Sequence, residues 1–114
     1  MKSNFDLTSF YKKVIDLIVL NDYESAINCI ENSKRFLDDD ELALACLNCG
    51  FLYDKLGKHA FAIEYFSEAI YSEGKLDILD GRSKDISFNA RSNSRYKNGD
   101  YKGAIEDKRQ ARNI

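Results

Sequence analysis

Apolar residues in the middle of the chain recur at spacings of three and four, the period of a helix with a buried face. The first such stretch is apolar around most of its circumference, which predicts a helix covered on more than one side; its apolar and small residues are Leu44, Cys46, Leu47, Cys49, Gly50, Phe51, Leu52 and Tyr53. Leu56-Gly57 ends this helix, because glycine readily adopts the left-handed conformation that closes helices. The apolar face of a second helix follows: Phe61, Ala62, Ile63, Tyr65, Phe66, Ala69 and Ile70. The pattern predicts an antiparallel helix hairpin in which Gly50 and Ala62 permit close approach.

This hairpin pattern occurs three times along the chain. Residues 21–27 (NDYESAI), 57–63 (GKHAFAI) and 99–105 (GDYKGAI) align, and another small residue follows seven positions after each aligned alanine: Ser33, Ala69 and Ala111. The copies are 36 and 42 residues apart. Periods of this size are typical of stacked helical hairpins, in which each unit buries its apolar face against its neighbours. Asn21 takes the place of the turn glycine in the first copy.

The repeat resembles the tetratricopeptide repeat family. In the middle copy the resemblance rests on Gly50, Tyr53, Gly57, Ala62, Ile63, Tyr65, Phe66 and Ala69, and in the third copy on the stretch from Asn89 to Asp107. In the first copy Phe10, Val14 and Leu17 form the helix face, with valine where a small residue is usual. The match runs from about Leu7 to Ile114. It implies an all-α fold, a right-handed α-solenoid of three antiparallel helix hairpins, as a single domain over residues 1–114 with repeats at about 7–40, 43–76 and 85–114.

Two features depart from the family pattern. The second spacing has eight residues more than the family period of about 34, and they fall between Ala69 and Phe88. Breaks at Gly74, Asp80-Gly81 and Ser83 predict longer helices or a short structured loop there. The last helix is largely polar and leaves few residues for a core (Ala104, Ile105, Ala111 and Ile114), so we expect it to act as the solvated end of the array.

The resemblance also implies a function, because the concave face of this family commonly holds an extended peptide or a partner helix. By the family offsets, that groove is lined by Tyr11, Ile15, Asn48, Phe51, Lys55, Asn89, Asn93 and Lys97. Asparagine amides can hydrogen-bond a peptide backbone in both directions, while Ile15 and Phe51 supply apolar contact. Phe51 has the alternative of packing between repeats. One subgroup clamps a C-terminal carboxylate, but of its residues the chain matches only Asn48, which argues against that activity.

Length and composition fit one globular domain: 114 residues, 44% hydrophobic and 32% charged. No apolar run approaches the roughly 20 residues that span a bilayer, and no apolar segment follows a basic start. We therefore expect a cytoplasmic protein without a secretory signal or a membrane contact.

The charge is uneven along the chain. Residues 1–81 have 8 Lys and Arg against 15 Asp and Glu, whereas residues 82–114 have 9 against 4. An overall net charge of −2 disfavours a nucleic-acid partner. The polarity does allow acidic and basic ends to associate. Two functions stay open: a peptide-binding adaptor, assembly factor or chaperone-like module, and a self-associating scaffold module held by contacts between acidic and basic ends. In either case we expect a monomer or a weak homo-oligomer.

The candidate chemical groups favour a non-enzymatic protein without a cofactor. Cys46 and Cys49 lie within a helix at packing positions, and only Cys29 and His59 remain as further zinc ligands, without paired spacing. We expect both thiols to be reduced and buried. His59 occupies the place of Tyr23 and Tyr101, which indicates a packing role, and the six glycines form no phosphate-binding motif.

Two charged patterns predict structural contacts. The acidic run 38–41 precedes an apolar helix, where carboxylates stabilise the positive end of the helix dipole. Arg91 lies eight residues before Gly99 and Asp107 eight after it. In a hairpin that turns at Gly99 the two face each other. We expect an ion pair between helices there, which gives Arg91 and its neighbour Arg95 a structural rather than a nucleic-acid-binding role.

Overall fold

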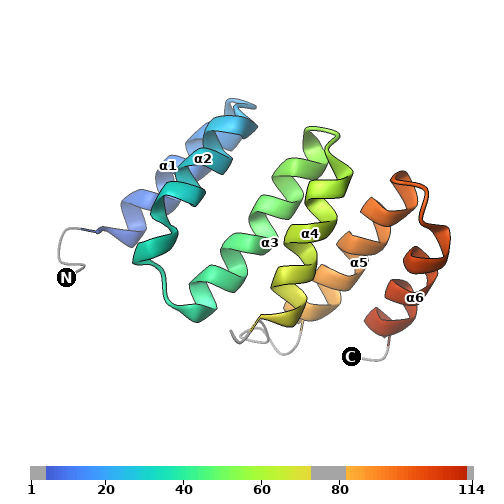
Figure 1. Cartoon of the computed structure of the whole chain (residues 1–114). Coiled ribbons are helices and arrows are strands. Elements are labelled where there is room, and N and C mark those ends of the chain that lie inside the picture. The colour runs from blue at the N-terminus through green and yellow to red at the C-terminus, as the bar shows by residue number, and fades with distance from the viewer. Residues whose placement is uncertain (1–4, 73–81, 113–114) are drawn as a thin grey trace.

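Every regular element in the described part of the chain is a helix, as the hydrophobic period predicts. The structure is a computed structural model that describes residues 5–72 and 82–112 (Figure 1). Its elements are α1 (Leu7–Val19), α2 (Tyr23–Ser33), the short 3₁₀ helix η1 (Lys34–Phe36), α3 (Asp39–Lys55), α4 (His59–Tyr71), α5 (Arg82–Lys97) and α6 (Tyr101–Arg112). Within those residues there is no strand, and no helix is long and apolar enough to cross a membrane.

The helices pack in sequence order, each one on the next, in a molecule of 45 × 28 × 19 Å. Figure 1 shows α1 with α2, α3 with α4 and α5 with α6 as neighbouring pairs, with their three tight turns along one edge. Helix α3 also contacts α5, so these two first helices of consecutive pairs are neighbours. The breaks expected at Gly74 and Asp80-Gly81 lie outside the described residues, and Ser83 lies within α5.

The three turns share one backbone geometry. Asn21, Gly57 and Gly99 have positive φ angles of 60°, 75° and 88°. The amide after each of them bonds a carbonyl five residues back, over 2.9, 2.9 and 2.8 Å: Asp22 to Leu17, Lys58 to Tyr53 and Asp100 to Arg95. This six-to-one bond is the Schellman closure of a helix end. The predicted left-handed turns, including the one at Asn21, are confirmed.

The acidic run marks the start of α3, as predicted. Asp38 is the N-cap, and its Oδ1 accepts a 2.8 Å bond from the Glu41 amide. Glu41 Oε1 in turn accepts a 2.9 Å bond from the Asp38 amide, which completes a capping box. The carboxylates of this first turn therefore satisfy backbone donors and complement the helix dipole.

Two apolar clusters meet at α3, so its all-round apolar character matches its position. The first joins α1 and α2 to one side of α3 and includes Phe10, Val14, Ala26, Ile27, Ile30, Leu37, Ala45, Cys49 and Leu52. The second joins its other side to α4 and α5 and includes Ala43, Cys46, Leu47, Ala62, Phe66, Ala69 and Ala90. Burial of these side chains on both sides supplies most of the hydrophobic stabilisation of the described residues.

Two expectations about packing need correction. A Cβ at Gly50 would lie 2.5 Å from the Phe66 ring, so the glycine makes room for an aromatic side chain of α4 rather than for Ala62 alone. Ile105 was expected in the core but is 62% exposed, because no described helix covers that side of α6. Ala104 and Ala111 are buried as expected, and Ile114 lies outside the described residues.

Candidate functional site

The eight predicted groove residues lie on the first helix of each pair. Tyr11 and Ile15 are on α1, the next three on α3, and the last three on α5. Tyr11, Asn48 and Asn89 are half-buried, and the others are exposed: Ile15, Phe51, Lys55, Asn93 and Lys97.

The structure brings Tyr11 and Asn48 together at the junction of α1 and α3. Both line a narrow gap with Ile30 and Ala45. Burial, followed by the negative charges of Glu41 and Asp38, raises the pKa of the Tyr11 hydroxyl. Tyr11 therefore stays a neutral hydroxyl at neutral pH beside the acidic start of α3, with Asn48 as its polar neighbour.

Phe51 is divided between the core and solvent. Its ring lies 5.1 Å from the Phe66 ring in an edge-on arrangement, yet 41% of the residue is exposed. Asn48 precedes it by about one helical turn and so lies on the same side of α3. One edge of the Phe51 ring therefore packs against α4 of its own hairpin rather than between repeats, while the rest of the side chain is an exposed apolar surface.

The α5 residues of the predicted groove are already engaged. The Asn89 amide donates to the carbonyl oxygen and to Oδ1 of Asp85, at 3.0 and 3.1 Å, and its Oδ1 accepts a 3.0 Å bond from Lys108. Lys97 Nζ lies 3.1 Å from Asp54 Oδ2. Asn93 lines a hollow with Tyr96 and with residues of α6. Two of the three α5 groove residues, Asn89 and Lys97, therefore already have polar partners within the protein.

Asp54 is the centre of a polar cluster that the sequence analysis missed. Its carboxylate lies 2.6 Å from His59 Nδ1 and accepts bonds from Ser94 Oγ (3.0 Å) and Lys97 Nζ (3.1 Å). Burial opposes the charged form, but the hydrogen bonds from His59, Lys97 and Ser94 outweigh it and lower the pKa of Asp54. The cluster joins α3, α4 and α5. The available signal was that Asp54 and His59 flank the turn at Gly57.

His59 therefore does more than fill the place of a tyrosine, since it bonds a carboxylate. The arrangement nevertheless lacks the geometry of a nucleophilic triad. In such a triad the histidine accepts the proton of the nucleophilic hydroxyl, whereas Ser94 here donates to Asp54. The cluster links neighbouring helix pairs.

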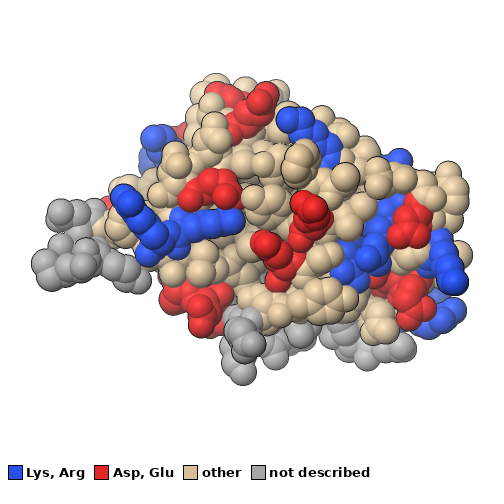
Figure 2. All heavy atoms as spheres, in the orientation of Figure 1, with Lys and Arg blue, Asp and Glu red and all other residues tan. Residues whose placement is uncertain are grey.

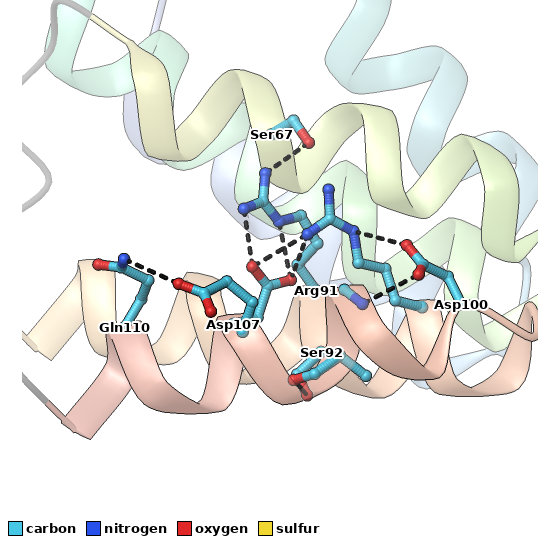
Figure 3. Close-up of polar contacts among 10 residues, drawn as sticks. Ser67, Arg91, Ser92, Asp100, Asp107 and Gln110 are labelled. Atoms are coloured by element: carbon cyan, nitrogen blue, oxygen red, sulfur yellow. Dashed lines mark hydrogen bonds and ion pairs between the residues drawn. The ribbon is translucent and has the colours of Figure 1, made fainter.

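A second polar cluster, centred on Asp107, joins α5 and α6 (Figure 3). Arg91 donates to both oxygens of Asp107 over 3.0 and 2.8 Å, and Arg95 Nη1 lies 3.0 Å from Oδ2. Arg91 also donates to Ser67 of α4 at 2.9 Å. The side chains of Arg91 and Asp107 are only 5% and 2% exposed. The predicted ion pair across the Gly99 turn is confirmed.

The cysteines are free thiols in the described residues. Cys46 and Cys49 are buried, Cys29 is half-buried, and Cys46 Sγ lies 3.4 Å from Glu68 Oε2. Burial is the main cause that raises the pKa of Cys46 to about 11 and that of Cys49 to about 12. Among the residues with described side chains, no group of three or more His, Cys, Asp or Glu is placed to hold a metal ion.

Comparison with known proteins provides no relative from which a function could be transferred. No protein-family model matches the chain, and no curated protein matches it. The side-chain geometry and the internal repeat are therefore the grounds for a functional proposal.

Proposed function

We propose that the protein is a non-enzymatic interaction module, a right-handed α-solenoid of three tetratricopeptide-like hairpins that binds a peptide or a helix of a partner protein. Three observations support this architecture: the equivalent turns at Asn21, Gly57 and Gly99, the packing of each helix on the next, and the contact between α3 and α5. Its role is that of an adaptor, assembly factor or chaperone-like protein. The binding surface consists of the exposed sides of α1 and α3.

The observation that supports this most directly is the exposure of apolar side chains on first helices. Ile15 on α1 and Phe51 on α3 are large hydrophobic residues that the two apolar clusters leave partly uncovered. Apolar anchors beside polar groups that can bond a backbone are typical of peptide-binding surfaces. Asn48 provides such a group next to Phe51, and Lys55 adds an exposed cation.

The α5 side chains contribute less to this surface. Asn89 and Lys97 have bonds within the protein that a ligand would need to replace. We therefore centre the binding surface on the first two helix pairs, with Asn48 and Phe51 in its middle.

The experiment compares Phe51→Ala and Asn48→Ala with Phe61→Ala. Phe61 is an exposed phenylalanine on α4 that stacks on Tyr53, so it controls for the loss of a partly exposed ring outside the surface. A partner is first captured from native lysate with the immobilised chain, identified and purified. Its affinity for each variant is then measured by calorimetry, and the unfolding free energy by urea titration.

We expect Phe51→Ala to weaken binding by about 1–2 kcal/mol, or roughly 5- to 30-fold, while Phe61→Ala leaves it unchanged. If both surface variants bind the partner as tightly as the parent, the surface is assigned wrongly.

The alternative function is self-association of a scaffold module through acidic and basic ends. Such contacts weaken as ionic strength rises, so the apparent mass from light scattering should fall between low and high salt. Lys12 and Lys13 on the exposed side of α1 count against an acidic surface at that end.

A further inference from the structure

The α5–α6 end of the molecule has an exposed apolar surface. Tyr96, Tyr101 and Ile105 are exposed to 59%, 60% and 62%, and the two tyrosine rings contact each other with centroids 5.1 Å apart. A hollow of about 390 Å³ lies beside them, and its lining is termed the end face here: Ser92, Asn93, Tyr96, Tyr101, Ala104, Ile105 and Lys108. Exposed apolar surface of this kind marks an interaction site.

The end face repeats surfaces that other helices cover earlier in the chain. With the spacings of 36 and 42, Ala104 and Ile105 align with the identical pair Ala26 and Ile27 on α2. Ile27 is only 4% exposed, in the cluster to which α3 contributes Ala45, Cys49 and Leu52. On α4 the aligned pair is Ala62, which is buried in the cluster that includes Ala90 of α5, and Ile63, which is half-buried. In each earlier pair, the following helix covers this face.

Lys108 indicates which charge a helix packed on the end face would carry. It aligns with Ile30 and Phe66, which are both about 1% exposed. Its Nζ bonds Asn89 at 3.0 Å, and no carboxylate among the described residues pairs with it. Arg112, one turn further along α6, is exposed as well, and Figure 2 shows cations crowded over this end with carboxylates among them. A helix that packs on the end face would bury the Lys108 cation, so it needs an acidic residue opposite Lys108, at a position where α3 and α5, which pack on α2 and α4, have none.

We propose that the end face binds an amphipathic helix of a partner protein, with small and apolar residues on one side and a carboxylate opposite Lys108. This surface is separate from the proposed binding surface on α1 and α3, and Asn93 is the one residue that it shares with the groove predicted from the sequence.

A second copy of this chain fits the end face poorly. By the same alignment, Lys13 and Asp16 of α1 take the places of Cys49 and Leu52, which α3 uses to cover α2. Lys13 and Asp16 are exposed and charged, and the neighbouring Lys12 adds a further cation. If α1 of one copy packed on the end face of another, its charged side chains would meet apolar ones, and Lys12 and Lys13 would lie near Lys108. Two end faces in contact would likewise oppose their cations.

The test uses the helix that covers the equivalent face. The probe is a fluorescent synthetic peptide of residues 38–56, the α3 sequence, with Cys46→Ala and Cys49→Ala. Ala45 and Asn48 line the same gap as Ile30, the residue that Lys108 replaces. One peptide therefore has Asn48→Glu and its matched partner has Asn48→Lys. Binding to the intact protein is followed by fluorescence anisotropy.

We expect the glutamate peptide to bind at least about tenfold more tightly than the lysine peptide. Lys108→Glu in the protein should reverse that preference. Ile105→Asp should abolish binding, whereas Leu20→Asp should not, because Leu20 is 74% exposed at the opposite end of the molecule. Phe51→Ala should leave peptide binding intact, which separates this site from the groove.

Three results would overturn the proposal: equal binding of the two peptides, binding that survives Ile105→Asp, or a dimer that Ile105→Asp disrupts while neither peptide binds. The last result would identify a second copy as the occupant. All substituted side chains are exposed, and circular dichroism of each variant checks that its helix content is unchanged.

Discussion

Asp107→Asn should be one of the most destabilising single substitutions in the chain. The carboxylate is 2% exposed, accepts two bonds from Arg91 over 3.0 and 2.8 Å, and lies 3.0 Å from Arg95. The amide keeps the shape but removes the charge, which leaves the buried Arg91 guanidinium without its counter-ion. Breaking one side of a buried ion pair costs about 3–5 kcal/mol. Since a domain of this size has roughly 5–15 kcal/mol in total, the loss is a large fraction.

Glu106→Gln is the matched control, because it is the neighbouring residue of α6 and its ion pair with Arg109 is more than half exposed. Exposed pairs of this kind contribute about 0–1 kcal/mol. Urea unfolding at pH 7, followed by circular dichroism, gives both free energies. With a slope of about 1–3 kcal/mol per molar urea, Asp107→Asn should lower the urea midpoint by about 1 M or more. The reasoning fails if Asp107→Asn costs no more than Glu106→Gln.

Three further predictions concern the interior of the protein. Gly50→Ala should lower the unfolding free energy by about 1–3 kcal/mol, because the added methyl meets the Phe66 ring; an unchanged urea midpoint would contradict this close approach. Because the pKa of Asp54 is lowered below 3.8, its carboxylate contributes stability above that pH and loses it as the pH falls further. The unfolding free energies of the parent and Asp54→Asn should therefore converge as the pH is lowered from about 5 to below 3.8, and a constant difference would refute the role of the cluster. Cys46 and Cys49 should resist a thiol reagent at pH 8 without denaturant, because pKa values of about 11 and 12 leave about one thiolate in a thousand and in ten thousand; rapid modification of both would show that they are accessible.

The turns and the Asp107 cluster could be predicted because their signals are local. Asn21, Gly57 and Gly99 stand at equivalent places in three similar segments, and each closes a helix by a rule that depends on a few neighbouring residues. Arg91 and Asp107 are symmetric about one of these turns, so the hairpin geometry alone places them face to face.

The exposure of Ile105 could not be predicted from its own segment. The aligned Ile27 is buried, and nothing in residues 99–105 distinguishes the two positions. The difference arises because a further helix covers α2, whereas none in the described residues covers α6. Whether a residue at the end of a repeat is buried therefore depends on whether another helix packs against it, which its own segment does not encode.

The serines of α5 are the converse case, in which polar residues are buried. Ser87, Ser92 and Ser94 are almost fully buried, although serine is a polar residue that is mostly exposed in proteins. Ser92 Oγ donates to the Ala104 carbonyl oxygen at 2.7 Å and Ser94 to Asp54, which is 40 residues away. The bonds of Ser94 and Lys97 to Asp54 cross between helix pairs, so they depend on how the pairs stack, and the Lys97 bond occupies one end of the predicted groove.

The polar interior of the last helix pair has a thermal consequence. Among the side chains of α5 and α6 that the structure describes, the buried ones are alanines together with Ser87, Arg91, Ser92, Ser94 and Asp107, whereas α1 to α3 bury phenylalanine, valine, leucine and isoleucine. Exposing apolar area on unfolding raises the heat capacity, by about 0.45 cal/mol/K per Å², and exposing polar area lowers it. Unfolding of α5 and α6 therefore has the smaller heat-capacity change, and the stability of that pair varies more nearly linearly with temperature. Cooling weakens the hydrophobic contacts of α1 to α3 more than those of α5 and α6, so the helix pair that is held by ions and hydroxyls is the one whose stability is least sensitive to cold.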